Sequence, residues 1–136
     1  MPAEPRSNRE IADIFLGIAD RMDMLGEDRF RSLAYRRAGE AIADLPMPLA
    51  DYRARSALED IPGIGATIAD KIATVLDTGD LPLAARLRGQ LPDGVLDLLR
   101  VPELGPSKAA RLHKELGLAS LADLRAAIEA GTIRAL

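Results

Sequence analysis

Two stretches of the chain share a pattern in which a proline and a glycine precede a helix-forming run. The first reads Ile61-Pro-Gly-Ile-Gly65, and the second reads Val101-Pro-Glu-Leu-Gly105, 40 residues later. The proline ends the incoming helix, and the last glycine omits a side chain where the backbone turns tightly or approaches a ligand. The amides that follow are unpaired donors at a helix N-terminus, backed by the helix dipole. This pattern predicts two helix-hairpin-helix motifs, each with a site for a phosphate oxygen.

The residues expected to contact phosphate lie at the hairpin and in the first turns of the helix that follows it. They are Gly63, Gly65, Ala66 and Thr67 in the first copy, and Gly105, Ser107, Lys108 and Arg111 in the second. The second copy departs from the pattern, because Glu103 stands where the first has Gly63. A carboxylate repels a phosphate, so the second hairpin is expected to bind more weakly. The alternative is that both hairpins are helical corners that pack and bind nothing.

Other kinds of site are excluded by composition. The chain has no Cys and a single His113, which leaves no thiolate metal site, no multi-histidine site and no His-paired nucleophile. No apolar run approaches the roughly 20 residues that cross a bilayer, and the N-terminus has no apolar signal-peptide centre. We therefore expect a cytoplasmic protein, associated with the nucleoid if bacterial, with no membrane partner.

The overall charge does not favour a nucleic-acid partner. The net charge is −3 and the isoelectric point is about 5.2, whereas nucleic-acid-binding domains usually carry a basic surplus. A binding face needs only a local excess, however, and basic residues cluster over 29–37 and over 100–114. Charge alone leaves the question open.

The hairpins lie in a chain whose composition and periodicity predict helices throughout. Leu and Ala are abundant, and no stretch alternates as a strand would. The predicted class is all-α, with helix ends at capping residues. The first two expected helices run from Ser7 to Gly26 and from about Asp28 to Asp44, followed by a linker or short helical turn over 46–56. The first hairpin begins near Leu58 and closes at Thr78-Gly79. Later helices are expected near Pro82 to Gln90, after Pro92-Asp93-Gly94 to Arg100, from the second hairpin to Leu116, and from Ser120 to Gly131.

The second of these helices carries an apolar stripe. The residues expected to be buried along it are Phe30, Leu33, Ala34, Ala41, Ile42 and Leu45. Phe30 could instead stack on an exposed base, but its position on the stripe favours packing in the core.

Several segments resemble the N-terminal region of X-family DNA polymerases, the polymerase-beta family. The similar segments begin at Phe30-Arg31-Ser-Leu-Ala-Tyr35-Arg36-Arg37, continue through both hairpins, and close with Glu115 to Leu124, so the resemblance covers nearly the whole chain. It implies an 8-kDa domain over 1–79 and a second helix-hairpin-helix subdomain over 80–136. It also implies binding to the 5′-phosphate side and the primer side of gapped or nicked DNA, with a polymerase domain possible in cis. The polymerase's carboxylate-bearing palm is not in these 136 residues.

The same resemblance implies a possible 5′-deoxyribose-phosphate lyase. Lys71 matches the family's Schiff-base lysine and Tyr35 matches its neighbour, while Arg31 falls where the family often has a phosphate-binding lysine and Arg36 flanks the tyrosine. Lys71 is also the only Lys among the first 107 residues, and a guanidinium cannot serve as an amine nucleophile. Against this, Thr67 replaces a second pocket lysine, so Lys71 could equally be a solvated or backbone-contacting residue.

Further expectations rest on the resemblance. The hairpin carbonyls of Ile61, Ile64, Val101 and Leu104 could bind a monovalent cation, K+ or Na+, and no other cofactor is expected. Three functions remain open at this point. They are sequence-independent binding of gapped or nicked DNA, the same binding with lyase activity, and a protein-interaction domain that has lost DNA binding.

Overall fold

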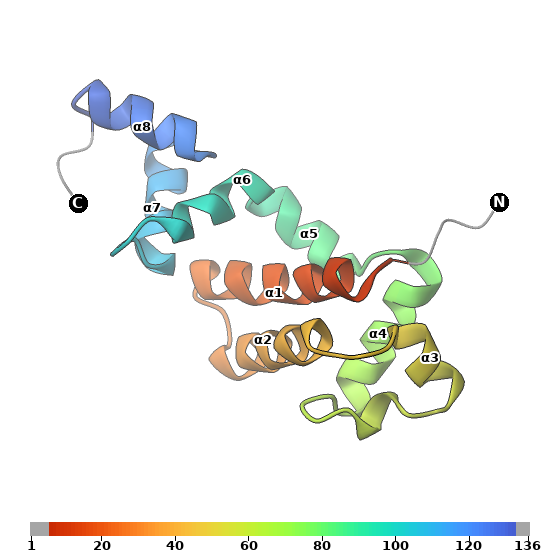
Figure 1. Ribbon diagram of the computed structural model, residues 1–136. Coiled ribbons are helices and arrows are strands. Elements are labelled where there is room, and N and C mark those ends of the chain that lie inside the picture. The colour runs from red at the N-terminus through yellow and green to blue at the C-terminus, as the bar shows by residue number, and fades with distance from the viewer. Residues whose placement is uncertain (1–5, 133–136) are drawn as a thin grey trace.

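The chain folds into helices joined by short connections. The computed structural model describes residues 6–132, and every regular element in that range is helical, as predicted (Figure 1). The elements are α1 (Asn8–Leu25), α2 (Arg29–Ala43), α3 (Leu49–Ala54), η1 (Leu58–Asp60), α4 (Ala66–Thr78), α5 (Pro82–Gln90), α6 (Asp93–Leu96), η2 (Asp97–Arg100), α7 (Pro106–Leu116) and α8 (Leu121–Glu129).

The predicted capping residues set the helix ends. At the start of α1 the Ser7 hydroxyl accepts the Glu10 amide, and the Glu10 carboxylate accepts the Ser7 amide at 3.0 Å. The hydrogen bond from the Ser7 amide, and then the Ser7 hydroxyl beside the carboxylate, hold the pKa of Glu10 below its usual range. Asp28 caps α2 and Ser120 caps α8 through their side-chain oxygens. Local hydrogen bonding therefore confirms the helix boundaries that the sequence predicts.

α1 and α2 form a close pair. Small residues make this possible, because a Cβ added to Gly39 of α2 would lie 2.6 Å from the Leu16 side chain of α1. The side chains of α2 that are buried are Ser32, Tyr35, Ala38, Gly39 and Ile42.

The prediction that the apolar stripe of α2 is buried is therefore wrong for the first half of the helix. Phe30 is 87% exposed, and Leu33 and Ala34 are exposed as well. The helix turns its small residues toward α1, since close packing there excludes larger side chains. The larger apolar residues at its N-terminal end are left in solvent. Ala41, Ile42 and Leu45 do pack on the core as expected.

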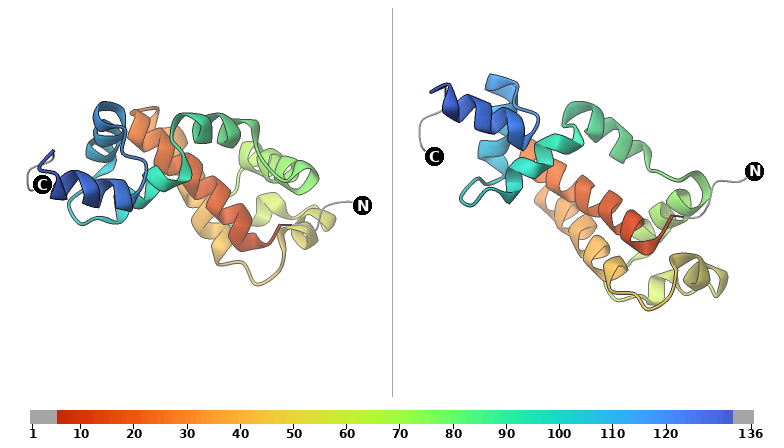
Figure 2. Two further views of the ribbon diagram at one scale, coloured as in Figure 1. Left: turned by 90° about the horizontal axis from the view of Figure 1, so that it is seen from above. Right: turned by 45° about the horizontal axis from the view of Figure 1, so that its top comes forward.

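The buried side chains form two clusters. The larger gathers residues of α1 to α5, from Ile11 to Leu87, and the smaller gathers residues from Leu91 to Leu124 together with Met24 of α1. Helix α1 thus contributes to both cores. It runs between α2 on one side and α5 and α6 on the other, with α7 at its C-terminal end (Figures 1 and 2). The predicted boundary between two domains, at residues 79 and 80, stays a prediction. The two clusters of buried residues meet further along the chain, between Leu87 and Leu91.

Among residues 6–132, no helix is both long enough and apolar enough to cross a membrane.

Candidate nucleic-acid interface

The first hairpin is the turn between η1 and α4. The Ile64 amide donates to the Ile61 carbonyl at 3.0 Å, and both side chains are buried. Gly63 takes the left-handed conformation with φ 92°, which glycine adopts without strain. Its α-carbon faces α2, because an added Cβ would lie 3.8 Å from the Arg37 carbonyl oxygen. The backbone of α2 thus supports the tip of the hairpin.

The second hairpin, between η2 and α7, repeats this geometry. The Leu104 amide donates to the Val101 carbonyl at 3.0 Å, and Leu104 is buried. Glu103 occupies the position of Gly63 and also has a positive φ, of 70°. A residue with a Cβ is strained in this region. The same turn is therefore formed in both copies, at a conformational cost in the second.

The last glycine of each motif has a different role. Gly65 has φ −91° and Gly105 has φ −77°, so neither makes the turn. A Cβ added to either one would meet no atom within 4 Å. The fold therefore needs no glycine here. What the missing side chain provides is an open approach from solvent to the helix N-terminus.

Both helix N-termini present uncapped amides. Gly65 and Gly105 are the N-cap residues of α4 and α7, and no side chain caps either helix. Ala66 and Thr67 in the first motif, and Ser107 and Lys108 in the second, are exposed. Pro106 has no amide hydrogen, so α7 offers one donor fewer than α4. The predicted phosphate donors are thus accessible, and none is capped by a carboxylate of the described chain.

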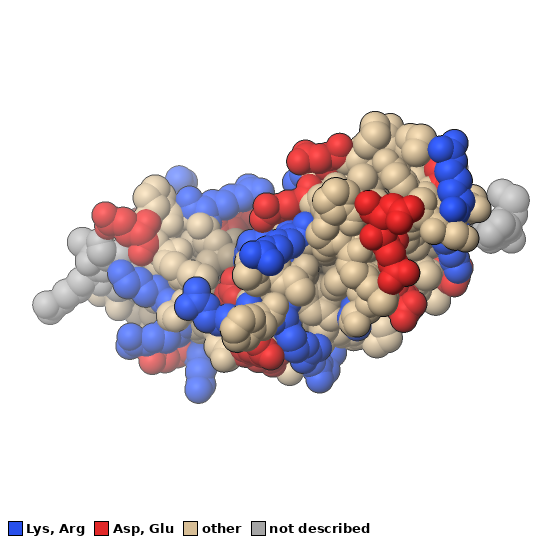
Figure 3. All heavy atoms as spheres, turned by 90° about the horizontal axis from the view of Figure 1, so that it is seen from below, with Lys and Arg blue, Asp and Glu red and all other residues tan. Residues whose placement is uncertain are grey.

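Helix α2, whose backbone meets the first hairpin at Arg37, carries exposed arginines. Arg31 and Arg37 are exposed, and neither pairs with a carboxylate among residues 6–132. Seen from below the view of Figure 1, Lys and Arg spread over the α7 and α8 side and the middle of this face, while the largest acidic group lies toward the other end (Figure 3). A local basic excess therefore exists despite the net charge.

Arg36, in contrast, faces α1. Its guanidinium donates to Asp20 at 2.8 Å and to Asp23 at 3.0 Å. Burial lowers the pKa of Arg36, but the hydrogen bonds and charges of the two carboxylates outweigh burial and raise it. Its predicted contact with DNA is not favoured by this geometry, because two carboxylates already neutralise it. Arg37, which the sequence prediction left out, is the α2 arginine beside the hairpin.

The structure brings together the two residues predicted for lyase chemistry. The Lys71 Nζ lies 5.9 Å from the centre of the Tyr35 ring, which is buried and packs on Phe15. Lys71 is half-buried on α4 and forms no ion pair with the described carboxylates. Tyr35 therefore forms a wall behind the amine.

The cation prediction is compatible with the hairpin backbone. The carbonyls of Ile61 and Val101 each accept one amide, and a carbonyl oxygen has a second lone pair. The cation itself stays a prediction. Among the described residues, no cluster of three or more His, Cys, Asp or Glu could hold a metal ion.

A protein family and several curated proteins match this chain in sequence. A family model described as a helix-hairpin-helix domain matches residues 6–81. The chain is 30% identical over 131 residues to a DNA polymerase/3′-5′ exonuclease PolX of Bacillus subtilis strain 168, a match covering 94% of this chain. It is 26% identical to DNA polymerase lambda of Rattus norvegicus over 90% of the chain, and 31% identical to that of Arabidopsis thaliana over 89%.

These relatives are much longer than the matched region. The chain spans 22% of the length of each one. The matched part is the N-terminal part of the polymerases, which confirms the resemblance to that region of the X family.

Proposed function

Since this chain belongs to the helix-hairpin-helix domain family, we propose that it binds the DNA backbone without reading base sequence. The observation that carries the proposal is the repeated open N-terminus, in which a glycine that the fold does not need exposes uncapped amides. Amides at a helix N-terminus bind phosphate oxygens, and every nucleotide supplies the same phosphate. Polymerase relatives, which act on DNA, support the same partner.

The gap preference is part of this proposal. Two hairpins on one chain suit a substrate with two duplex arms, one on each side of a gap or nick. The first hairpin, with Arg31 and Arg37, would take the 5′-phosphate arm, and the second, with Lys108, the primer arm. Arg111 is exposed on α7 and pairs there with Glu115 at 3.6 Å, so Lys108 is the cation of the second hairpin that has no such partner among the described residues. Phe30 is exposed beside the α2 arginines and is free to stack on an unpaired base.

A substitution of the open glycines tests backbone binding. Gly65→Val and Gly105→Val should keep the fold, because a Cβ at either position meets nothing within 4 Å. They should weaken binding to gapped DNA about tenfold or more, because the side chain blocks the phosphate approach. Gly89→Val is the matched control, since its Cβ is also unobstructed but it lies in α5, away from both hairpins.

The affinity for DNA should also fall as the salt concentration rises, and it should not depend on base sequence. Fluorescence anisotropy with gapped, nicked and intact duplexes at several salt concentrations measures both properties. Absence of binding at low salt, or equal binding by the Gly65→Val and wild-type proteins, would favour the alternative of a protein-interaction domain.

Lyase activity is a second candidate, favoured by the position of Lys71 against Tyr35. The neutral amine of Lys71 would attack C1′ of the ring-opened abasic sugar, and loss of water would leave an iminium. Removal of a C2′ proton then breaks the C3′–O bond and releases DNA with a 5′-phosphate, while water frees the lysine from the sugar fragment. Borohydride trapping tests this step. Wild-type protein should form a covalent adduct and Lys71→Ala should not, with Lys114→Ala, at an exposed lysine of α7, as the control.

A further inference from the structure

The two hairpins are joined through the C-terminal half of α1. Most of this helix packs in the larger core, whereas Met24 is buried in the smaller core with Leu98 and Leu104 of the second motif. One helix therefore touches the supports of both hairpins. Whatever fixes the contact between α1 and the second motif also fixes the relative position of the two hairpins.

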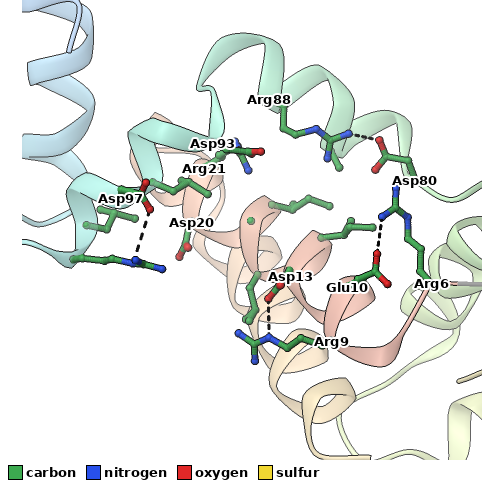
Figure 4. Close-up of a pocket in the computed structure, with 18 residues that line it drawn as sticks. Arg6, Arg9, Glu10, Asp13, Asp20, Arg21, Asp80, Arg88, Asp93 and Asp97 are labelled. Atoms are coloured by element: carbon green, nitrogen blue, oxygen red, sulfur yellow. Dashed lines mark hydrogen bonds and ion pairs between the residues drawn. The ribbon is translucent and has the colours of Figure 1, made fainter. Parts of the chain in front are cut away.

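Arg21 makes this contact specific. Its Nε donates to the Leu91 carbonyl at 2.6 Å and its Nη2 to the Asp93 carboxylate at 2.5 Å, both at the turn between α5 and α6. Figure 4 shows Arg21 reaching from α1 toward Asp93. The residue is only 4% exposed, and its neighbour Gly17 leaves room, because a Cβ there would lie 2.9 Å from Nη1.

Burial makes this interaction selective for one arrangement. A buried guanidinium is unfavourable unless its donors are satisfied, and here the partners come from the other side of the α1–α6 contact. Moving the second motif away from α1 would break both hydrogen bonds at once. The Asp93 side chain is 82% exposed, so the bond to the Leu91 carbonyl, which is buried, is the better shielded of the two and contributes most to holding the second motif in place.

Beside these core contacts and the Arg21 interaction, a cleft opens between the two sides. It has a volume of about 860 Å³ and lies between α1 and the α5–η2 segment. The other ion pairs in it stay within one wall, such as Arg9 with Asp13 on α1 and Arg88 with Asp80 on the α5 side. Among the described residues lining the cleft, Arg21 and Asp93 form the ion pair that crosses from α1 to α6.

We propose that Arg21 is a positioning residue that holds the two hairpins as one rigid, bivalent DNA-binding unit. This inference rests on the proposed function, because it assigns the spacing of the two phosphate sites to a residue that touches no DNA. When the first hairpin is bound, a fixed second hairpin sits at a high effective concentration near its own phosphates. Loss of the contact would spread that hairpin over many orientations.

A double-mutant cycle on gapped DNA tests the coupling. Arg21→Met keeps an apolar stem of similar length and should weaken binding about tenfold by reducing effective concentration. Lys108→Ala in the second hairpin should weaken the wild-type protein severalfold but add little to Arg21→Met. Arg9→Met, on an exposed arginine of the same helix, should leave both affinities unchanged. Unchanged binding by Arg21→Met, or an undiminished effect of Lys108→Ala in its background, would overturn the proposal.

A distance measurement tests the same inference without DNA. The chain has no cysteine, so Asp70→Cys on α4 and Lys114→Cys on α7 allow two spin labels at exposed positions. Pulsed electron resonance should give a narrow distance distribution, and Arg21→Met should broaden it. If Arg21→Met loses helical circular dichroism, Asp93→Asn, which keeps the Leu91 bond, is measured against the same criteria.

The two proposals fail in different ways. If wild-type protein binds no DNA, the proposed function fails, while the distance distribution still decides whether Arg21 fixes the hairpins. If the protein binds DNA and the distance distribution is equally narrow with and without Arg21→Met, the positioning role is refuted and DNA binding stands.

Discussion

Replacement of Glu103 by glycine should strengthen DNA binding and stabilise the fold at once. Glu103 takes φ 70° at the position where the first hairpin has Gly63, and its carboxylate is exposed at the hairpin tip. The substitution removes two separate disadvantages of the second hairpin, the backbone strain and the negative charge near a phosphate. Each can be measured with its own variant.

The size of the two effects follows from simple terms. A left-handed conformation destabilises the folded state by about 1–2 kcal/mol when the residue has a Cβ. Glycine avoids this strain, but it loses more conformational entropy on folding, which offsets about 0.5–1 kcal/mol of the gain. A net gain of about 0.5–1 kcal/mol should raise the Tm by about 2–4 °C in a chain of this size. Two unit charges about 7 Å apart in water repel by about 0.6 kcal/mol, which is roughly a threefold change in affinity.

Three variants separate the contributions. Glu103→Gln removes the charge and keeps the Cβ, so it should raise affinity for gapped DNA about threefold with little change in Tm. Glu103→Gly should raise both. Ser56→Gly is the matched control for strain, because Ser56 has φ 55° outside the hairpins, and it should raise the Tm alone. Calorimetry gives the Tm, and anisotropy at low salt gives the affinity.

The reasoning would be refuted by two results. A fall in Tm for Glu103→Gly, with Ser56→Gly rising, would mean that the glutamate makes a stabilising contact outweighing its strain. Unchanged or weaker binding by Glu103→Gln would mean that no phosphate approaches the second hairpin.

Other substitutions test the neighbouring surface. Phe30→Ala should leave the Tm unchanged, because the ring is 87% exposed, and should weaken binding to gapped DNA by about 1–3 kcal/mol but not to intact duplex. Arg37→Gln should reduce the slope of log K against log salt by about 0.9 in a salt titration, whereas Arg36→Gln should lower the Tm and leave the slope unchanged. Arg53 holds the pKa of Asp77 below its usual 3.8, so this pair stabilises the fold above that value and stops doing so as the pH falls through the lowered pKa. The Tm difference between Asp77→Asn and wild type should therefore be present at neutral pH and vanish in strong acid, and an unchanged difference would contradict the assignment.

The parts of the fold that the sequence predicts correctly depend on local interactions. Ser7, Asp28 and Ser120 cap the helices where their types and spacing place them, because a cap bonds amides two or three residues away. The repeated hairpins are predictable for the same reason. Pro62 and Gly63 act on the backbone of a few neighbouring residues, whatever the rest of the chain does.

The parts that the sequence misses depend on which surfaces meet. Phe30 belongs to an apolar stripe by periodicity, but α2 turns Ala38 and Gly39 toward α1 and leaves Phe30 in solvent. Arg36 and Arg37 are indistinguishable by type, yet one meets the carboxylates of α1 and the other lies beside the hairpin. The available signal was the pair of small residues, which indicates the side of a helix that packs closely.

The acidic net charge is a weaker argument against DNA binding when the proposed phosphate donors are backbone amides. Net charge sums the side chains, but the groups that would hold phosphate are amides of α4 and α7, whose partial positive charge enters no such sum. Part of the negative charge is also neutralised in place, as when Asp20 and Asp23 share Arg36 and Asp93 pairs with Arg21. An anion at the hairpins therefore meets backbone dipoles and a few unpaired cations, and the remaining acids act on it from farther away through screening solvent. A protein with this arrangement can bind DNA weakly at each hairpin and still bind a gapped duplex well, provided the two hairpins are held at the spacing of its two arms.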